Sequence, residues 1–317
     1  MASGAVEWFD RATSAADQWP LERLLAAKGD HRISVVVPAR NEAPTIGEIV
    51  GRLRADLVDA VRLVDELVVI DSDSNDGTAA IAAASGATVH AARAIRPDLG
   101  GEPGKGEALW KSQFVTTGDV LVFIDADLTS WGTHFVTGLL GPLLTDPAVE
   151  LVKGFYDRVL DDGSGRHAPQ GGRVTELVAR PLLNLRQPEL ARVVQPLGGE
   201  WAIRRRTFAE LAVPTGYGVE LATLLAVYER GGLDAIAQVD LGSRAHTHQS
   251  VHDLGLMAAE LLAVALRRLG PDVGPDVGGA DLWQFDRALD PPWRARPVPL
   301  AERPPFVTLE AADAPAG

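Results

Sequence analysis

A run of five apolar residues followed by two aspartates constrains the fold of this chain more than any other feature. Residues 120–124 are Val-Leu-Val-Phe-Ile, and Asp125 and Asp127 follow with Ala126 between them. Such a run is typical of a strand that is buried on both faces. Alternate residues of an extended segment point the same way, so both carboxylates can converge on one cation such as Mg²⁺. The simpler alternative is that these aspartates only cap the following turn.

Strand and helix patterns alternate around this run. Strand-like runs also occupy residues 33–37, 67–70 and 88–90, with helical patterns between them. We expect Pro38 to end the first of these strands, because proline cannot donate to a strand ladder. Strands that alternate with helices and end in polar residues predict an α/β fold with a mostly parallel sheet and a site at one edge.

The second half of the chain continues this alternation and adds a long apolar helix. Strands are predicted at residues 151–156 and 239–242, and a helix at 221–228. The helix predicted at 251–269 has an apolar surface wider than one stripe, so it is either deeply buried or a contact in an oligomer. We interpret the basic turn at 204–206 as a solvated face.

Composition excludes several classes of function. The formal net charge of −13 argues against a nucleic-acid partner, and it requires a local basic pocket for any anionic ligand. The chain has no cysteine, which excludes disulfides, thiolate metal sites and a cysteine nucleophile. No run approaches the roughly 20 apolar residues that span a bilayer, and no secretory leader is visible. We therefore expect a cytoplasmic protein with no membrane partner.

Three motifs are shared by many nucleotide-sugar glycosyltransferases of the GT-A fold. They are Val-Val-Val-Pro-Ala-Arg-Asn-Glu at 35–42, Val-Ile-Asp-Ser-Asp-Ser at 69–74 and Asp-Ala-Asp at 125–127. Four further motifs are specific to one family of these enzymes. They are Gly-Lys-Gly-Glu-Ala-Leu-Trp at 104–110, Gly-Arg-Val-Thr-Glu-Leu at 172–177, Gly-Glu at 199–200 and Gly-Tyr-Gly-Val-Glu at 216–220. Over roughly residues 30–270 the chain closely resembles the glucosyl-3-phosphoglycerate synthases, retaining enzymes of glycosyltransferase family 81.

This resemblance implies the organisation of the chain. The fold would be GT-A, with a mostly parallel Rossmann-like sheet flanked by helices and an added C-terminal helix and tail. We expect an N-terminal helical extension at 1–29, a catalytic domain at 30–270 and a Pro- and Gly-rich tail at 271–317. Within the catalytic domain, residues 30–130 would form the nucleotide-sugar half and residues 131–270 the acceptor half.

The resemblance also implies a donor site. The residues expected to bind the donor are Pro38, Ala39, Asn41, Glu42, Ser72, Lys105, Asp125 and Ala126. Ser72 would lie at the uracil and Asp125 at the ribose, while Asp127 and His246 would bind the Mg²⁺ or Mn²⁺ ion that carries the diphosphate. From the residues alone, a histidine such as His246 is more often a surface or capping residue than a ligand.

An acceptor site is implied by Gly172, Arg173, Thr175 and His248. A helix N-terminus offers unpaired N–H groups, and an arginine adds a bidentate fork for phosphate. The alternative for Arg173 is a solvated side chain near a helix start. At His248 the chain departs from the family, whose members carry an asparagine that helps to hold the acceptor.

The implied reaction is transfer of glucose from UDP-glucose to the 2-hydroxyl of 3-phosphoglycerate, by a homodimer. Asp127, Glu220 and His246 are the expected catalytic residues, and Glu220 would hydrogen-bond the sugar hydroxyls. We see no second carboxylate placed as a nucleophile, so the leaving phosphate would accept the acceptor's proton in a same-face substitution. The alternatives are a GDP-mannose donor and a non-catalytic protein that binds nucleotide sugars.

Overall fold

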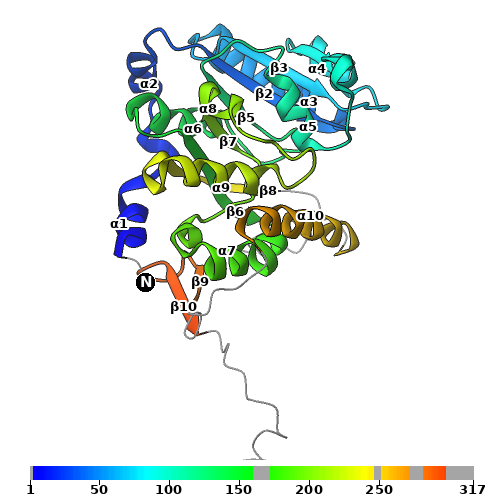
Figure 1. The fold of residues 1–317 in the computed structure, drawn as a ribbon. Helices are drawn as coiled ribbons and strands as arrows, with labels where there is room; N and C mark the ends of the chain where they lie inside the picture. The colour runs from blue at the N-terminus through cyan, green and yellow to red at the C-terminus, as the bar shows by residue number, and fades with distance from the viewer. Residues whose placement is uncertain (1–2, 160–171, 246–250, 271–280, 298–317) are drawn as a thin grey trace, which may run out of the picture.

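The core of the molecule is an eight-stranded, mostly parallel sheet with helices on both faces (Figure 1). The computed structural model describes residues 3–159, 172–245, 251–270 and 281–297. The strand order is β1-β8-β6-β7-β5-β2-β3-β4, and β7 runs antiparallel to both of its neighbours. The strands are β1 (Thr13–Ala15), β2 (Ile33–Ala39), β3 (Glu66–Asp71), β4 (Thr88–Ala91), β5 (Val120–Phe123), β6 (Leu151–Val159), β7 (Trp201–Arg204) and β8 (Ile236–Ala245).

Two apolar layers cover the faces of this sheet. One layer packs α2, α3, α4 and α6 against it, and the other packs α1, α5, α7, α9 and α10. The helices are α1 (Ser3–Ala12), α2 (Leu21–Lys28), α3 (Ala43–Leu53), α4 (Thr78–Ala84), α5 (Lys105–Ser112), α6 (His134–Thr145), α7 (Arg180–Arg186), α8 (Arg205–Ala209), α9 (Val219–Gly231) and α10 (Val251–Leu269). None of these described helices is long and apolar enough to cross a membrane.

Strand β5 confirms the prediction of a strand buried on both faces. Val120 and Val122 belong to one apolar layer, while Leu121 and Phe123 belong to the other. All four side chains are fully buried. The strand ends at Phe123, so Asp125 follows at its carboxyl end.

The expectation that Pro38 ends the first strand was wrong, because β2 continues through Pro38 to Ala39. On one side, Pro38 pairs in register with Ile70 of β3. On the other side, the ladder with β5 ends at Val36, which accepts the last bond from the N–H of Ile124. The missing N–H of Pro38 therefore falls where no ladder partner requires it.

Both ends of the chain add strands that the sequence patterns did not indicate. Residues 13–15 were expected to be helical, but they form β1, which pairs with β8 at the edge of the sheet. Within the expected tail, β9 (Asp281–Phe285) and β10 (Trp293–Pro297) form an antiparallel hairpin. Trp293 of this hairpin packs edge-on against Phe9 of α1 with ring centroids 5.5 Å apart, so the hairpin lies beside α1 (Figure 1).

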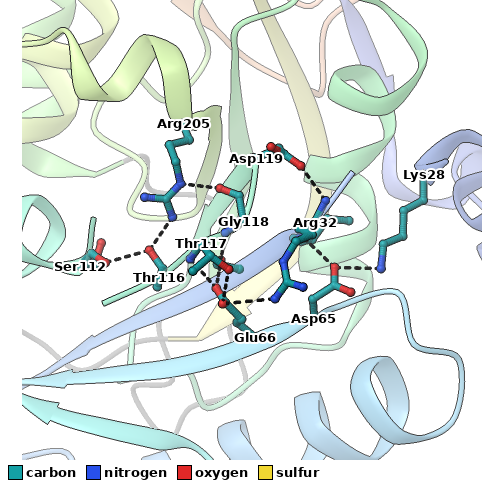
Figure 2. A network of polar contacts seen from close by, with 12 residues as sticks. Lys28, Arg32, Asp65, Glu66, Ser112, Thr116, Thr117, Gly118, Asp119 and Arg205 are labelled. Atoms are coloured by element: carbon teal, nitrogen blue, oxygen red, sulfur yellow. Dashed lines mark hydrogen bonds and ion pairs between the residues drawn. The ribbon is translucent and has the colours of Figure 1, made fainter. Parts of the chain in front are cut away.

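Glu66 is the centre of a polar network at the amino ends of β2, β3 and β5 (Figure 2). Its carboxylate accepts bonds from the hydroxyl of Ser34 and from the N–H and hydroxyl of Thr117. Although burial opposes its charge, these bonds lower the pKa of Glu66 to about 2. The network therefore ties three strands together at the end of the sheet opposite Asp125.

The prediction of a solvated basic turn at 204–206 was wrong for two of its three arginines. Arg204 is buried, and its guanidinium donates to the carbonyl oxygens of Leu143 and Val149 at 2.8 Å each. Arg205 is half-buried and donates to the carbonyl of Gly118 in the network of Figure 2. Arg206 is the member that is exposed.

Candidate active site

A cavity of about 640 Å³ opens at the carboxyl ends of β2, β5 and β8. Such a position is where open α/β sheets bind ligands. Most of the residues expected from the sequence line it, namely Pro38, Ala39, Glu42, Ser72, Lys105, Asp125, Ala126, Asp127, Gly172, Arg173, Thr175 and Glu220. The expected donor and acceptor residues therefore share one cavity.

Three expected residues are not placed in the lining. Asn41 lies beside the lining residue Glu42 and has a left-handed backbone with φ of 60°. Its N–H donates to the Ser74 hydroxyl at 2.9 Å, and its side-chain oxygen accepts from the Asn75 N–H at 3.0 Å. These bonds shape the loop next to the cavity. His246 and His248 lie outside the described residues.

Lys105 connects two carboxylates at the floor of the cavity. Its Nζ lies 2.6 Å from Asp125 Oδ1 and 2.9 Å from Glu220 Oε1. Although burial opposes its charge, these two carboxylates raise the pKa of Lys105 above its usual value. Although burial likewise opposes the charge of Asp125, Lys105 and Arg244 hold the pKa of Asp125 well below its usual range. The lysine and the aspartate are therefore both charged at neutral pH.

Two glycines allow Lys105 to reach this position. Gly104 has φ of 131°, which strains other residues, and a Cβ atom there would lie 2.4 Å from the Thr215 carbonyl oxygen. A Cβ atom on Gly106 would lie 1.9 Å from the Pro214 carbonyl oxygen. The start of α5 therefore packs directly against the backbone at 214–215, which continues to Glu220 on α9.

Arg244, near the end of β8, was missed by the sequence reasoning although it lies at the centre of the site. The arginine is 5% exposed. Its Nη1 lies 3.2 Å from Asp125 Oδ2 and 2.8 Å from Glu200 Oε1, and its Nη2 lies 2.5 Å from Asp127 Oδ1. Nη1 also donates to the Tyr156 hydroxyl at 2.7 Å. The rule that predicted Asp125 is that polar residues at the carboxyl ends of parallel strands form sites, and the same rule could have found Arg244.

Glu200 is the most buried carboxylate of this group, with no exposed surface. Burial raises the pKa of Glu200, and the Arg244 guanidinium opposes that shift. The sequence singled out Gly199-Glu200 only as part of a family motif, and the structure shows Glu200 as the buried counter-charge of Arg244.

Asp127 and Glu42 place two carboxyl groups in the lining of the cavity. The side chain of Asp127 is 40% exposed, which leaves it accessible from the cavity. Burial, followed by the negative charges of Asp127 and Asp125, raises the pKa of Glu42 to about 7. Carboxylate oxygens are ligands that fit Mg²⁺ or Mn²⁺. Within the described residues no group of three or more potential ligands is found, and His246 lies outside them. The pairing of Asp127 with His246 stays a prediction.

The cavity is also lined by the helical turn that was expected to bind the acceptor. The N–H of Glu176 donates to the Gly172 carbonyl at 2.9 Å, so the turn starts at Gly172, as the sequence predicted. Arg173 is half-buried and Thr175 is 4% exposed, and both line the cavity. Leu254, Leu256 and Met257 of α10 add apolar surface to the lining.

Known proteins resemble this chain over most of its length. Residues 34–210 match the model of the glycosyl transferase family 2. The chain is 47% identical to the glucosyl-3-phosphoglycerate synthase of Mycobacterium tuberculosis over 92% of this chain and 90% of that protein. It is 46% identical to the enzyme of the same name from Mycolicibacterium smegmatis over 95% of this chain and 98% of that protein.

Solved structures of the Mycobacterium tuberculosis enzyme share this fold. One, in complex with Mn²⁺, UDP-glucose and phosphoglyceric acid, aligns with a TM-score of 0.73 at 44% identity over 92% of this chain and 95% of that chain. Another, in complex with Mn²⁺, UDP and glucosyl-3-phosphoglycerate, aligns with a TM-score of 0.73 at 43% identity over 92% of this chain and 96% of that chain.

Proposed function

Because the chain belongs to the family of the glucosyl-3-phosphoglycerate synthases, we propose that it transfers glucose from UDP-glucose to the 2-hydroxyl of 3-phosphoglycerate. The observation that carries the proposal is the single cavity of about 640 Å³ that gathers the expected donor and acceptor residues. Two substrates that bind in one cavity can bring the anomeric carbon and the attacking hydroxyl together.

The donor end is formed by Pro38, Ala39 and Ser72 at the carboxyl ends of β2 and β3. We propose that UDP binds along these residues and that Asp127, with His246, holds a Mg²⁺ or Mn²⁺ ion. The ion supplies charge neutralisation for the departing diphosphate. The accessible carboxylate of Asp127 in the cavity lining supports this assignment.

The acceptor end is formed by Gly172, Arg173 and Thr175. The start of a helical turn presents N–H groups to a phosphate, and the guanidinium of Arg173 adds charge-assisted bonds. In a chain with a net charge of −13, this local arrangement can still attract an anionic acceptor. We include His248 in the acceptor site as a proposal from sequence.

The carboxylates at the cavity floor support a same-face mechanism. Glu220 is 5% exposed, and both Glu220 and Asp125 are paired with Lys105. A carboxylate held by an ammonium is a weaker nucleophile than a free one. In our proposal Glu220 accepts bonds from the sugar hydroxyls, and the leaving phosphate oxygen takes the proton of the attacking hydroxyl.

A turnover assay tests the proposal. The purified protein is incubated with Mg²⁺, UDP-glucose and 3-phosphoglycerate, and UDP release and product mass are measured. We expect both substrates to be required and a product with the mass of glucosyl-3-phosphoglycerate. Transfer from GDP-mannose in preference to UDP-glucose would identify a mannosyltransferase. Binding of UDP-glucose without transfer would identify a non-catalytic binder and refute the proposal.

We also propose that the protein is a homodimer in the cytoplasm. Leu262 and Leu266 of α10 lie one turn apart and are 43% and 52% exposed. An exposed apolar stripe of this kind is typical of an interface, and a second copy would cover it. The double variant Leu262→Ser, Leu266→Ser should be monomeric by light scattering. Leu25→Ser on α2, where Leu25 is 40% exposed, is the matched control and should keep the wild-type mass. A wild-type protein that is monomeric at micromolar concentration would refute the dimer.

A further inference from the structure

Lys153 is a buried lysine of β6 that does not line the cavity. It is 1% exposed. Its Nζ donates to the carbonyl oxygen of Gly198 at 2.6 Å and lies 5.7 Å from the ring centroid of Trp201. Lysine is almost never fully buried unless its charge is satisfied, because removing an ammonium from water is costly. Packing alone therefore does not explain why a lysine is buried at this position.

The bond from Lys153 is one of several between β6 and the loop at 195–200. The N–H of Gly154 donates to the Glu200 carbonyl at 2.9 Å, and the side-chain amide of Gln195 donates to the carbonyl of Tyr156. The bonds from Gly154 and Gln195 fix the two ends of the loop. The bond from Lys153 fixes its middle, at Gly198.

The middle of this loop forms part of the cavity wall. Leu197 and Gly199 both line the cavity. Gly199 packs so closely against Asp125 that a Cβ atom there would lie 2.2 Å from Asp125 Oδ2. Since Gly198 lies between these two residues, the ammonium of Lys153 sets the backbone that faces Asp125.

The charges around Lys153 come from four elements of the site. Glu220 on α9, Glu200 before β7 and Asp125 after β5 favour the charged ammonium, whereas Lys105 on α5 opposes it. Burial is the largest effect and lowers the pKa of Lys153 to about 8. The ammonium thus also offsets part of the negative charge of the buried Glu200 and Glu220 and of the half-buried Asp125.

We propose that Lys153 is a positioning residue for glycosyl transfer, which acts by holding the Gly198 carbonyl and with it the wall of the cavity beside Asp125. This proposal rests on the proposed function. It assigns a role in the reaction to a residue that touches neither substrate.

The test compares Lys153→Met with the wild type. Methionine has a similar length but can neither donate a bond nor carry charge. We expect kcat to fall about ten- to a hundredfold, because a charged hydrogen bond that orders the reacting site is lost. The affinity for UDP, measured by calorimetry, should fall less than kcat, because Pro38, Ala39 and Ser72 would still bind the nucleotide. The midpoint of urea unfolding should fall less than in a variant of Lys111, because Lys153→Met removes one donor from the Gly198 carbonyl and no direct ion pair.

Lys111→Met is the matched control. Lys111 is also 1% exposed, but it pairs with Glu107 at 3.3 Å and donates to the carbonyl oxygens of Ala92 and Gly100. Its replacement removes a paired structural cation, so the urea midpoint should fall and kcat should fall less than in Lys153→Met. We therefore expect the larger loss of kcat in Lys153→Met and the larger loss of stability in Lys111→Met.

Two further measurements separate positioning from packing. Lys153→Gln keeps a donor near Gly198 and should recover part of the kcat that Lys153→Met loses. The pH dependence of kcat/KM reports groups that titrate in the free enzyme. For the wild type, kcat/KM should fall above about pH 8, as Lys153 loses its proton, and approach the value of Lys153→Met. Lys153→Met itself should show no such fall.

Three results would overturn the assignment: a wild-type kcat in Lys153→Met, a loss of UDP affinity as large as the loss of kcat, or no recovery in Lys153→Gln. If Lys153→Met does not fold, Lys153→Gln and the pH profile of the wild type decide the matter. A wild type that transfers no glucose would instead refute the proposed function.

Discussion

Replacement of Arg244 by methionine should lower the free energy of unfolding, because one specific carboxylate loses its counter-charge. The guanidinium contacts Asp125, Asp127 and Glu200. Asp125 retains Lys105 after the replacement, and the side chain of Asp127 is 40% exposed to solvent. Glu200 has no exposed surface and loses its cation. The variant therefore leaves the buried carboxylate of Glu200 without its arginine partner.

The size of the effect follows from that stranded charge. Breaking a buried ion pair from one side costs about 3–5 kcal/mol, because the remaining charge is left without compensation. Burial already raises the pKa of Glu200, and the loss of Arg244 removes the charge that opposes this shift. When the pKa of a carboxyl group is higher in the folded state than in the unfolded state, the protein loses stability as pH rises above the unfolded-state pKa of about 4.3. The deficit of Arg244→Met should therefore be smaller at pH 5 than at pH 7.5.

Urea unfolding of four proteins measures this directly: the wild type, Arg244→Met, Glu200→Gln and the double variant. The double variant should be more stable than Arg244→Met at pH 7.5, with a coupling energy of about 1–3 kcal/mol. Additive losses, or a deficit of Arg244→Met that does not change with pH, would show that Glu200 is not the stranded charge.

Three other variants test the metal, the acceptor and the fold. Asp127→Ala should nearly abolish transfer, at a cost of about 3 kcal/mol or more in the transition state, and should keep the wild-type circular dichroism; full activity would exclude the proposed ligand role. Arg173→Ala should raise KM for 3-phosphoglycerate about ten- to a hundredfold and leave KM for UDP-glucose nearly unchanged; equal changes would place Arg173 elsewhere. Glu66→Gln should cost about 1–3 kcal/mol at pH 7, since a pKa lowered from 4.5 to about 2 is worth at most about 3 kcal/mol at 1.36 kcal/mol per unit. In the wild type this contribution is present above pH 4.5 and is lost as pH falls through about 2, so equal stability of both proteins at pH 7 would contradict it.

Regular patterns predicted most of the elements that build the cavity. The run at 120–124 forms a strand buried on both faces, and α10 has the limits that its apolar pattern indicated. Strand β7 was missed because its four residues are too few for a period and are followed directly by arginines. A short antiparallel strand between two neighbours is specified by those neighbours rather than by its own sequence.

The charged interior of the site could not be predicted in the same way. Arg244 and Glu200 lie 44 positions apart, and each resembles an exposed residue when taken alone. Only the sheet order, which places β8 two strands from β7 and on the far side of β6, brings them together. Arg204 was misassigned for the same reason, because the carbonyl groups that it binds come from residues 143–149.

The anomeric configuration of the product tests the account most directly. The floor of the cavity places Asp125 and Glu220 in ion pairs with Lys105, which supports same-face transfer without a covalent intermediate. Proton NMR of the product formed from UDP-glucose, 3-phosphoglycerate and Mg²⁺ should therefore show the small coupling of an α-linked anomeric hydrogen. A β-linked product would mean inversion by a general base and would contradict the mechanism.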